Sequence, residues 1–235
     1  MNWQAAENDP RRRIIVALDL PSRGAALALA RQLAPHPGLF KVGLQLYTAA
    51  GPEIVHALRD LGGRVFLDLK LHDIPNTVAR AVESANSLGV EMLTLHLSGG
   101  RAMIAAAVAA RVSEMLLLGV TVLTSADETV LRQIGVGSSL EEQVVRLAAF
   151  GFESGISGFV ASPREITPLR AALGDRIKIV TPGIRPAGSA PDDQRRTMTP
   201  REALQAGADF LVIGRPITAA KDPRGALEQI VIDVV

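Results

Sequence analysis

Short apolar runs alternate along the chain with longer stretches in which alanine and leucine recur at helical spacing. Apolar runs bounded by Gly, Pro or Asp predict buried strands, whereas apolar positions three and four residues apart predict helices. Eight strands are expected, near 13–18, 40–44, 64–70, 92–96, 117–123, 158–161, 177–180 and 210–213. Helices are expected from residue 22, at 54–61, 79–88 and 102–110, in pieces up to 152, from residue 164, near 200–206, and after the last strand.

Consecutive strand–helix units of this kind favour a closed (β/α)8 TIM barrel, with an open doubly wound sheet as the alternative. The chain has 235 residues, of which 48% are apolar, and this is enough to bury one large core. No domain-sized linker or low-complexity tract interrupts the alternation. We therefore expect a single α/β domain over residues 13–235, preceded by a polar N-terminal arm over residues 1–12.

Composition and charge narrow the range of partners. The 25 basic and 24 acidic residues give a net charge of +1, so nothing favours nucleic acid or an anionic membrane. The chain has no cysteine, which excludes disulfides, thiolate nucleophiles and Cys-based zinc sites. No apolar run approaches the ~20 residues of a spanning helix, and the run that follows the arginines at 11–13 lacks a signal-peptide cleavage site. A cytoplasmic protein is expected.

Polar side chains gather where the expected strands end. The set consists of Asp19, Lys41, Asp68, Lys70, His96, Thr124, Arg185 and Arg215. The carboxyl ends of the strands of a TIM barrel meet at one face, and active sites of this fold lie there. Because buried charge is costly unless it is paired or used, this ring predicts an active site.

The segment "VFLDLKLHDIPNTV" at 65–78 holds the densest group of charges. Asp68 and Lys70 are two positions apart and should face the same side of their strand, while the leucines at 67, 69 and 71 face the helices. A lysine between Asp68 and Asp73 should stay protonated, which argues against a Schiff base and favours proton donation or anion binding. A carboxylate held against a substrate anion would favour loss of that anion, as in a decarboxylation.

Two other interpretations of this segment stay open. The charges could form an ion pair that only closes the end of the barrel, or Asp68 and Asp73 could bind a metal together with a histidine. The intervening Lys70 disfavours the metal site. Of the nearby histidines, His72 is expected to give structural support, and His96 to support the site from a position near Lys70.

A second cluster follows the last two strands, in "TPGIR" at 181–185 and "IGRPI" at 213–217. Backbone amides near Gly183 and Gly214 can approach an anion closely, and Arg215 supplies a fork of donors. The loops after strands seven and eight are the recurrent phosphate site of this fold, so a phosphorylated small molecule is the expected ligand. The long segment 183–196 is a candidate lid, with an ordinary surface loop as the alternative.

Several segments together resemble the orotidine 5′-phosphate decarboxylase family, over roughly residues 13–223. "FLDLKLHDIPNTV" is similar to the Asp-x-Lys-x-x-Asp-Ile-Pro-x-Thr signature of that family. The other segments follow in the order of the family: "KVGLQLYTAAGP" resembles its second strand, and "TVLTS", "VASPREI", "TPGIR", "DDQRRTMTP" and "VIGRPI" its later loops.

The resemblance implies that orotidine 5′-phosphate is decarboxylated to UMP and CO₂, the final step of de novo pyrimidine nucleotide synthesis, without a metal or organic cofactor. It implies that Lys70 protonates C6, that Asp68 lies against the substrate carboxylate, and that Lys41 and Asp73 complete the charged network. The implied substrate contacts come from Asp19, Lys41, Thr77, Thr124, Ser125, Pro182, Arg185, Gln194, Gly214 and Arg215.

The resemblance also implies a homodimer with shared sites, in which Asp73 and Thr77 enter the site of the partner, and a closing loop that carries Gln194. One alternative is a magnesium-dependent sugar-phosphate decarboxylase or aldolase of the same superfamily; "IPNT" and "DDQRR" favour the nucleotide enzyme. The other alternative is a barrel that binds a phosphorylated ligand without turnover. The costly Asp-Lys-Asp cluster argues against it.

Overall fold

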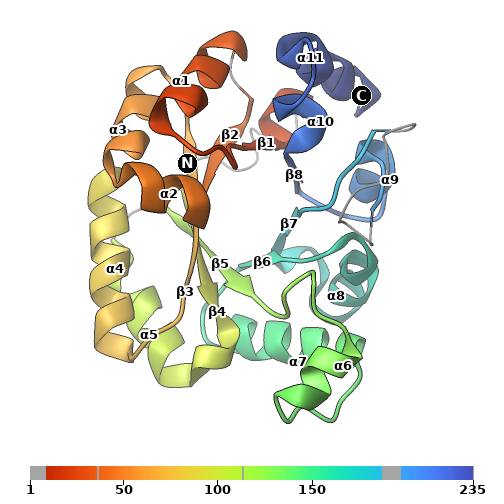
Figure 1. The fold of residues 1–235 in the computed structure, drawn as a ribbon. Coiled ribbons are helices and arrows are strands. Elements are labelled where there is room, and N and C mark those ends of the chain that lie inside the picture. The colour runs from red at the N-terminus through yellow and green to blue at the C-terminus, as the bar shows by residue number, and fades with distance from the viewer. Residues whose placement is uncertain (1–8, 36, 113, 187–196, 235) are drawn as a thin grey trace.

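Eight parallel strands close into a barrel in a computed structural model that describes residues 9–35, 37–112, 114–186 and 197–234 (Figure 1). The strands are β1 (Ile14–Ala17), β2 (Leu39–Gly43), β3 (Val65–Leu71), β4 (Met92–His96), β5 (Leu116–Val120), β6 (Gly158–Val160), β7 (Lys178–Thr181) and β8 (Phe210–Ile213). Each strand pairs with the next, and β1 pairs with β8, where Ile14 lies opposite Leu211. This closure confirms the predicted TIM barrel and excludes the open sheet.

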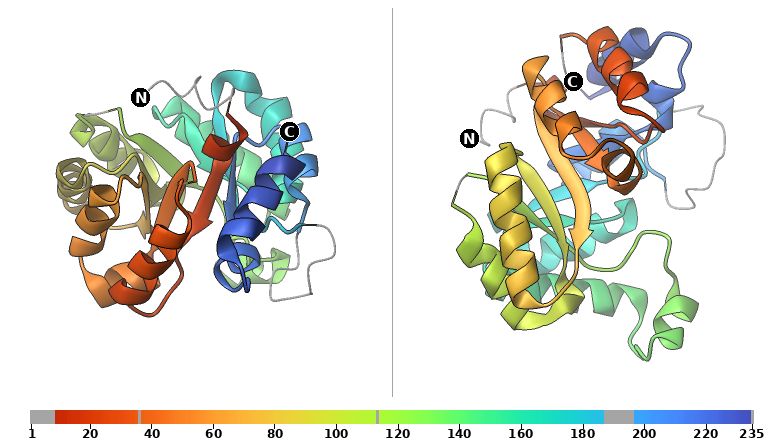
Figure 2. Two further views of the ribbon diagram at one scale, coloured as in Figure 1. Left: turned by 90° about the horizontal axis from the view of Figure 1, so that it is seen from above. Right: turned by 60° about the vertical axis from the view of Figure 1, so that its left-hand side comes forward.

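Helices surround the strands on the outside of the barrel (Figures 1 and 2). They are α1 (Arg23–Gln32), α2 (Leu44–Ala50), α3 (Glu53–Asp60), α4 (Pro75–Leu88), α5 (Gly100–Ala110), α6 (Glu128–Gln133), α7 (Leu140–Glu153), α8 (Ile166–Leu173), α9 (Pro200–Gln205), α10 (Arg215–Thr218) and α11 (Pro223–Asp233). Four short 3₁₀ helices, η2 (Pro10–Arg13), η3 (Leu97–Gly99), η4 (Pro163–Glu165) and η5 (Gly174–Arg176), complete the described elements. None of the described helices has the length and hydropathy that a membrane crossing requires.

Side chains alternate along each strand between two cores. The outer core lies between strands and helices, and Val16, Val42 and Leu67 belong to it. The inner core fills the barrel with residues such as Ile15, Phe66, Met92, Leu118, Val180 and Phe210. Since the inner core occupies the barrel, a ligand has access only above it, at one end of the strands.

Local sequence explains where several helices begin. Ser22 caps α1, and its hydroxyl accepts a hydrogen bond from the Ala25 amide, as the sequence predicted for a helix from residue 22. Ser139 and Thr199 begin α7 and α9 with capping boxes, in which a glutamate three residues later bonds back to the cap amide. These caps fix the points at which the chain turns away from the barrel.

Two predicted segments differ from the structure. The second strand ends at Gly43, and Leu44 already begins α2, a helix that the sequence analysis missed. The fifth strand ends at Val120, although the apolar run continues to Leu123. Val122 and Leu123 do not extend the sheet because they line the cavity described below. The apolar run therefore has two parts, a strand that ends at Val120 and a segment that lines the cavity.

Strand β3 is irregular where it carries the charged residues. Its pairing with β4 is regular at Leu67 and resumes only at Leu71, so the register shifts between them. Within this interval Lys70 has a φ of 51°, a left-handed backbone conformation that costs a residue with a Cβ roughly 1–2 kcal/mol. The predicted facing of the side chains is nevertheless confirmed, because Asp68 and Lys70 both line the cavity described below, whereas Leu67, Leu69 and Leu71 pack against the outer core.

The described part of the predicted N-terminal arm is attached to the barrel. Residues Pro10–Arg13 form η2, which is capped by the Asp9 carboxylate. The Arg11 guanidinium donates to the Pro35 carbonyl at 3.2 Å and pairs with Glu228 of α11. The Arg13 guanidinium donates to the carbonyls of Ala208 and Asp209 at 2.7 and 3.1 Å. These contacts join the start of β1 to the start of β8.

Candidate active site

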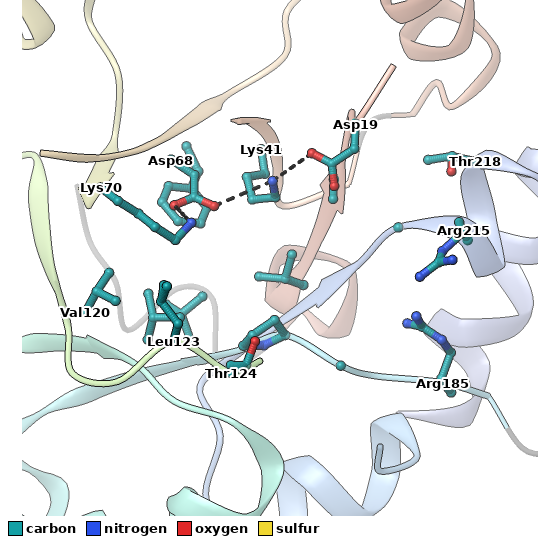
Figure 3. Close-up of a pocket in the computed structure, with 18 of the residues that line it drawn as sticks. Asp19, Lys41, Asp68, Lys70, Val120, Leu123, Thr124, Arg185, Arg215 and Thr218 are labelled. Carbon is teal, nitrogen blue, oxygen red and sulfur yellow. Dashed lines mark hydrogen bonds and ion pairs between the residues drawn. The ribbon is translucent and has the colours of Figure 1, made fainter. Parts of the chain in front are cut away.

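A cavity of about 460 Å³ opens at the carboxyl ends of the strands (Figure 3). This volume lies in the range of small-molecule sites. Its polar lining consists of Asp19, Lys41, Asp68, Lys70, Thr124, Arg185, Arg215 and Thr218. Apart from Thr218, all of these residues were predicted from the sequence, and the structure brings them together around one space.

One wall of the cavity carries four charges of alternating sign. The Lys41 ammonium group lies 2.9 Å from Asp19 Oδ1 and 3.6 Å from Asp68 Oδ2, and the Lys70 ammonium group lies 2.8 Å from Asp68 Oδ1. The side chains of Lys41 and Asp68 are only 11% and 12% exposed, whereas Asp19 is 56% exposed. The network thus runs from the rim of the cavity at Asp19 to a buried carboxylate at its centre. Its cations and anions alternate, which offsets the cost of burial.

The electrostatic surroundings keep Asp68 ionised. Burial is the largest influence and alone would raise the pKa of its carboxyl. The charges of Lys41 and Lys70, with hydrogen bonds from Lys70 and Thr94, outweigh burial and lower the pKa below its ordinary value. Asp68 is therefore an anion at neutral pH, in contact with the Lys70 ammonium group.

Gly43 gives the network the space that it needs. In the β2–β3 register Gly43 lies opposite Asp68, and its Cα faces the ends of Lys41 and Asp19. A Cβ at this position would lie 2.9 Å from Lys41 Nζ, closer than real Cβ contacts, and 3.2 Å from Asp19 Oδ1, tighter than most of them. The sequence analysis did not identify Gly43. Its signal was a glycine at the end of a strand, two residues after a predicted site lysine.

Thr94 of β4 is a second residue that the sequence analysis missed. Its side chain is completely buried. The Thr94 hydroxyl donates to Asp68 Oδ1 at 3.0 Å and accepts the Lys70 backbone N–H at 2.8 Å. The only signal in the sequence was a hydroxyl within the apolar run "MLTLH". A buried hydroxyl in a strand needs hydrogen-bond partners, and here both partners, Asp68 and Lys70, belong to the site.

The opposite end of the cavity is cationic. Arg185 follows β7 and Arg215 begins α10, and the two guanidinium groups lie across the cavity from Asp68 and Lys70 (Figure 3). Pro182, Gly183 and Gly214 line the same end. Gly183 has a φ of 80°, a conformation that glycine adopts without strain. Two arginines beside backbone that approaches closely can hold a phosphate group.

The remaining wall of the cavity is mostly apolar. It is formed by Ala17, Phe66, Val120, Val122, Leu123, Val160, Val180 and Val212, with Thr124 at its edge. A flat, mostly apolar ring fits such a region, with Thr124 available for a hydrogen bond. The cavity therefore offers one place for an anion, one for a ring and one for charged chemistry.

Several predicted site residues do not line this cavity. Asp73 and Thr77 are exposed at the start of α4, where Asp73 Oδ1 accepts the Ile74 amide at 2.6 Å. Ser125 is exposed beyond the edge of the cavity. Gln194 lies outside the described residues, as does most of the predicted lid. Within one chain, the charged network consequently ends at Lys70 and does not include Asp73.

The two histidines near Lys70 lie behind the cavity. The ring centroids of His72 and His96 are 5.3 Å apart, and neither residue lines the cavity. Burial lowers the pKa of His96, and the charges of His72 and Lys70 lower it further, against an opposing influence of Asp68. His96 is thus neutral at neutral pH. In the part of the chain that the structure describes, no three Asp, Glu or His side chains converge as metal ligands.

Comparisons with known proteins agree with this geometry. Residues 12–230 match the model of the orotidine 5′-phosphate decarboxylase / HUMPS family. The chain is 52% identical over 231 residues to orotidine 5′-phosphate decarboxylase of Moorella thermoacetica, covering 94% of this chain and 92% of that protein. It is 51% identical over 232 residues to the enzyme of the same name from Syntrophotalea carbinolica, covering 95% of each. The crystal structure of orotidine 5′-phosphate decarboxylase from Lactobacillus acidophilus superposes with a TM-score of 0.84 at 37% identity, covering 94% of this chain and 98% of that one.

Proposed function

The chain belongs to the orotidine 5′-phosphate decarboxylase / HUMPS family, and from this premise we propose that it converts orotidine 5′-phosphate to UMP and CO₂ in pyrimidine biosynthesis. The observation that carries the proposal is the arrangement of the cavity, with a buried Asp–Lys network at one end and two arginines at the other. This arrangement matches a substrate that has a phosphate at one end and a carboxylate on a ring at the other.

In the proposed mechanism Lys70 is the general acid. The bond between C6 of the pyrimidine and its carboxylate breaks, the electron pair stays at C6, and CO₂ leaves. The Lys70 ammonium group stabilises the developing carbanion and delivers a proton to C6. The ion pair of 2.8 Å with Asp68 supports this role because it holds the ammonium group at the wall of the cavity.

Asp68 has the opposite effect on the substrate. Its carboxylate stays ionised in the cavity wall and would lie against the carboxylate of the substrate. Two anions in contact repel each other in a partly buried site, and loss of CO₂ relieves the repulsion. Lys41 holds the second oxygen of Asp68 and keeps that carboxylate in place.

The rest of the substrate is assigned to the rest of the cavity. Arg185, Gln194, Gly214 and Arg215 would hold the phosphate, with Pro182 beside them, and Gln194 would act from a closing loop. Asp19 and Lys41 would bind the ribose hydroxyls, since their ion pair lies between the two ends of the cavity (Figure 3). Thr124 and Ser125 would contact the pyrimidine. Phosphate contacts far from C6 can hold the loop closed, so that binding energy at one end serves the chemistry at the other.

We further propose that the active unit is a homodimer in which Asp73 and Thr77 complete the site of the partner. Both residues are exposed, as is Ile74 between them, so the start of α4 is accessible to a second subunit. Mixed dimers test this arrangement. Lys70→Ala and Asp73→Ala subunits, inactive when separate, should regain about a quarter of the wild-type activity when mixed, because each mixed dimer of two symmetric subunits has one intact site. No regain would reject shared sites.

The activity itself is tested with purified wild-type protein and orotidine 5′-phosphate, with and without a chelator. We expect loss of substrate absorbance and formation of UMP at the same rate in both samples. No loss of orotidine 5′-phosphate in either sample, from folded protein, would instead favour a magnesium-dependent sugar-phosphate enzyme of the same superfamily. Binding of UMP by folded protein without any turnover of orotidine 5′-phosphate would indicate a binding barrel.

A further inference from the structure

Thr94 connects the two residues at the centre of the proposed mechanism. Its hydroxyl oxygen accepts the Lys70 backbone N–H at 2.8 Å and donates its own proton to Asp68 Oδ1 at 3.0 Å. Asp68 Oδ1 is the same oxygen that receives the Lys70 ammonium group at 2.8 Å. One buried hydroxyl thus bonds both to the backbone of the lysine and to the carboxylate that holds its side chain.

The backbone at this point has few other means of support. Regular pairing between β3 and β4 is interrupted from Leu67 to Leu71, and the Lys70 N–H donates to a side chain in place of a strand carbonyl. Lys70 also has the left-handed φ of 51°, which side chains other than glycine rarely adopt. Such a conformation persists only where the surroundings fix it, and strained residues of this kind gather at active sites.

We propose that Thr94 is a positioning residue, whose hydroxyl fixes the left-handed backbone of Lys70 and the orientation of Asp68 so that the ammonium group points into the cavity. The inference deepens the proposed function, on which its kinetic part rests. Thr94 does not touch the cavity itself, and therefore acts only through Asp68 and Lys70.

The role of Thr94 can be measured through the pKa of the Asp68 carboxyl, which depends on the groups around it. Lys41 from β2 and Lys70 from β3 face its carboxylate, and His96 from β4 interacts with it electrostatically. The Thr94 hydrogen bond adds to the influences that lower the pKa of Asp68. Because burial acts in the opposite direction, removing this hydrogen bond should raise the pKa of Asp68 toward its ordinary value.

Three substitutions separate the hydroxyl from the shape of the side chain. Thr94→Val keeps the branched shape and removes the hydroxyl, whereas Thr94→Ser keeps the hydroxyl and removes a methyl group. Thr129→Val on α6 is the control for loss of a threonine hydroxyl, because Thr129 is exposed and does not line the cavity.

The first readout is kinetic. We expect Thr94→Val to lower kcat for orotidine 5′-phosphate by about 10- to 100-fold, the factor that corresponds to one hydrogen bond to a charged group, with little change in KM. Thr94→Ser should recover most of the rate, and Thr129→Val should leave it unchanged. The acid limb of the pH profile should move to higher pH in Thr94→Val only.

The second readout does not require turnover. The pKa of the Asp68 carboxyl can be followed by ¹³C NMR titration, with the resonance assigned by its loss in Asp68→Asn. A higher Asp68 pKa in Thr94→Val than in wild type and in Thr94→Ser supports the proposal. An unchanged Asp68 pKa overturns it, whatever happens to rate or melting temperature. If wild-type protein failed to convert orotidine 5′-phosphate, the proposed function would fall while this titration still decided the role of Thr94.

Discussion

The Asp209 carboxylate, at the amino-terminal end of the barrel, is surrounded by donors, whereas the Lys70 ammonium group, at the carboxyl-terminal end, has one partner among the described residues and faces a cavity. Asp209 precedes β8 and accepts from Arg170 at 2.6 Å, from Lys178 at 3.0 Å and from the Ile179 amide at 2.7 Å. The Lys70 ammonium group has a hydrogen bond to Asp68 in the described structure, and its other N–H bonds are available to a ligand.

The charges at the amino-terminal end of the barrel join neighbouring strands, whereas those at the carboxyl-terminal end line a cavity. Arg170 also donates to the carbonyls of Gly207 and Ile177, so the Asp209 cluster joins the starts of β7 and β8. A second pair at this end, Arg64 with Glu91, joins the starts of β3 and β4. The carboxyl-terminal network instead holds side chains around a space. Similar acids and bases therefore serve stability at one end and chemistry at the other, as the fold predicts.

Among the substitutions that should change stability without changing activity, the largest effect is expected at Asp209. Asp209→Asn removes the charge that pairs with two partly buried cations, and we expect a loss of about 3 kcal/mol in the free energy of unfolding. Urea denaturation measures this loss. The kcat of the folded variant should be unchanged, since the substitution lies at the far end of the strands. A reduced kcat with unchanged stability would contradict the claim that the charges at this end serve only the stability of the fold.

At the cationic end of the cavity, Arg215→Ala should impair substrate capture and leave the fold intact. Loss of its bonds to phosphate should raise KM by roughly 10- to 100-fold, equivalent to about 2 kcal/mol. Arg101→Ala on α5 is the control, because that arginine is 61% exposed and does not line the cavity. Steady-state kinetics with equal KM values for both variants would reject the phosphate role of Arg215.

The lowered pKa of Asp68 predicts how stability depends on pH. A carboxyl whose pKa is lower in the folded than in the unfolded state stabilises the fold above the unfolded value, near 3.8, and loses this contribution as pH falls through the folded value. The difference in free energy of unfolding between wild type and Asp68→Asn should therefore shrink as the pH falls below about 3.8. Urea midpoints measured from neutral pH downward test this, and a difference independent of pH would contradict it.

The smallest effect is expected at Gly43. A methyl group in Gly43→Ala would push the Lys41 ammonium group away from Asp19, so we expect a several-fold rise in KM with little change in stability. Gly24→Ala in α1 is the matched control, because a Cβ there meets nothing within 4 Å and should leave KM unchanged. If both variants behave alike, the space at Gly43 does not matter to the site.

The strands and the polar residues at their ends could be predicted from the sequence, because both depend on the order of apolar and polar residues within short segments. Strands β4 and β8 have the predicted bounds, and the polar residues at strand ends, such as Asp19, Lys41 and Arg215, do line one cavity. Both successes rest on the same regularity, since a closed parallel barrel brings every strand end to one face.

The residues that were missed depend on contacts between strands. Thr94 meets Lys70 only because the β3–β4 register shifts, and nothing within "MLTLH" reveals that shift. Gly43 matters only because the ends of Lys41 and Asp19 meet above it. The helix α2 was missed because Leu44 continues an apolar strand pattern across the glycine at which the strand ends. Asp73 and Thr77 stay a prediction for a dimer, since both lie outside the cavity of their own chain.

Lys70 and Lys178 allow the most direct test of the account. Each lysine pairs with one aspartate, at 2.8 and 3.0 Å, and the two side chains are 29% and 27% exposed. Turnover of orotidine 5′-phosphate and melting temperature should be measured for Lys70→Ala and Lys178→Ala side by side. The account predicts that Lys70→Ala lowers kcat by about 10³-fold or more while the protein stays folded, whereas Lys178→Ala lowers the melting temperature and keeps its kcat. Unchanged turnover in folded Lys70→Ala, or the same pattern in both variants, would contradict it.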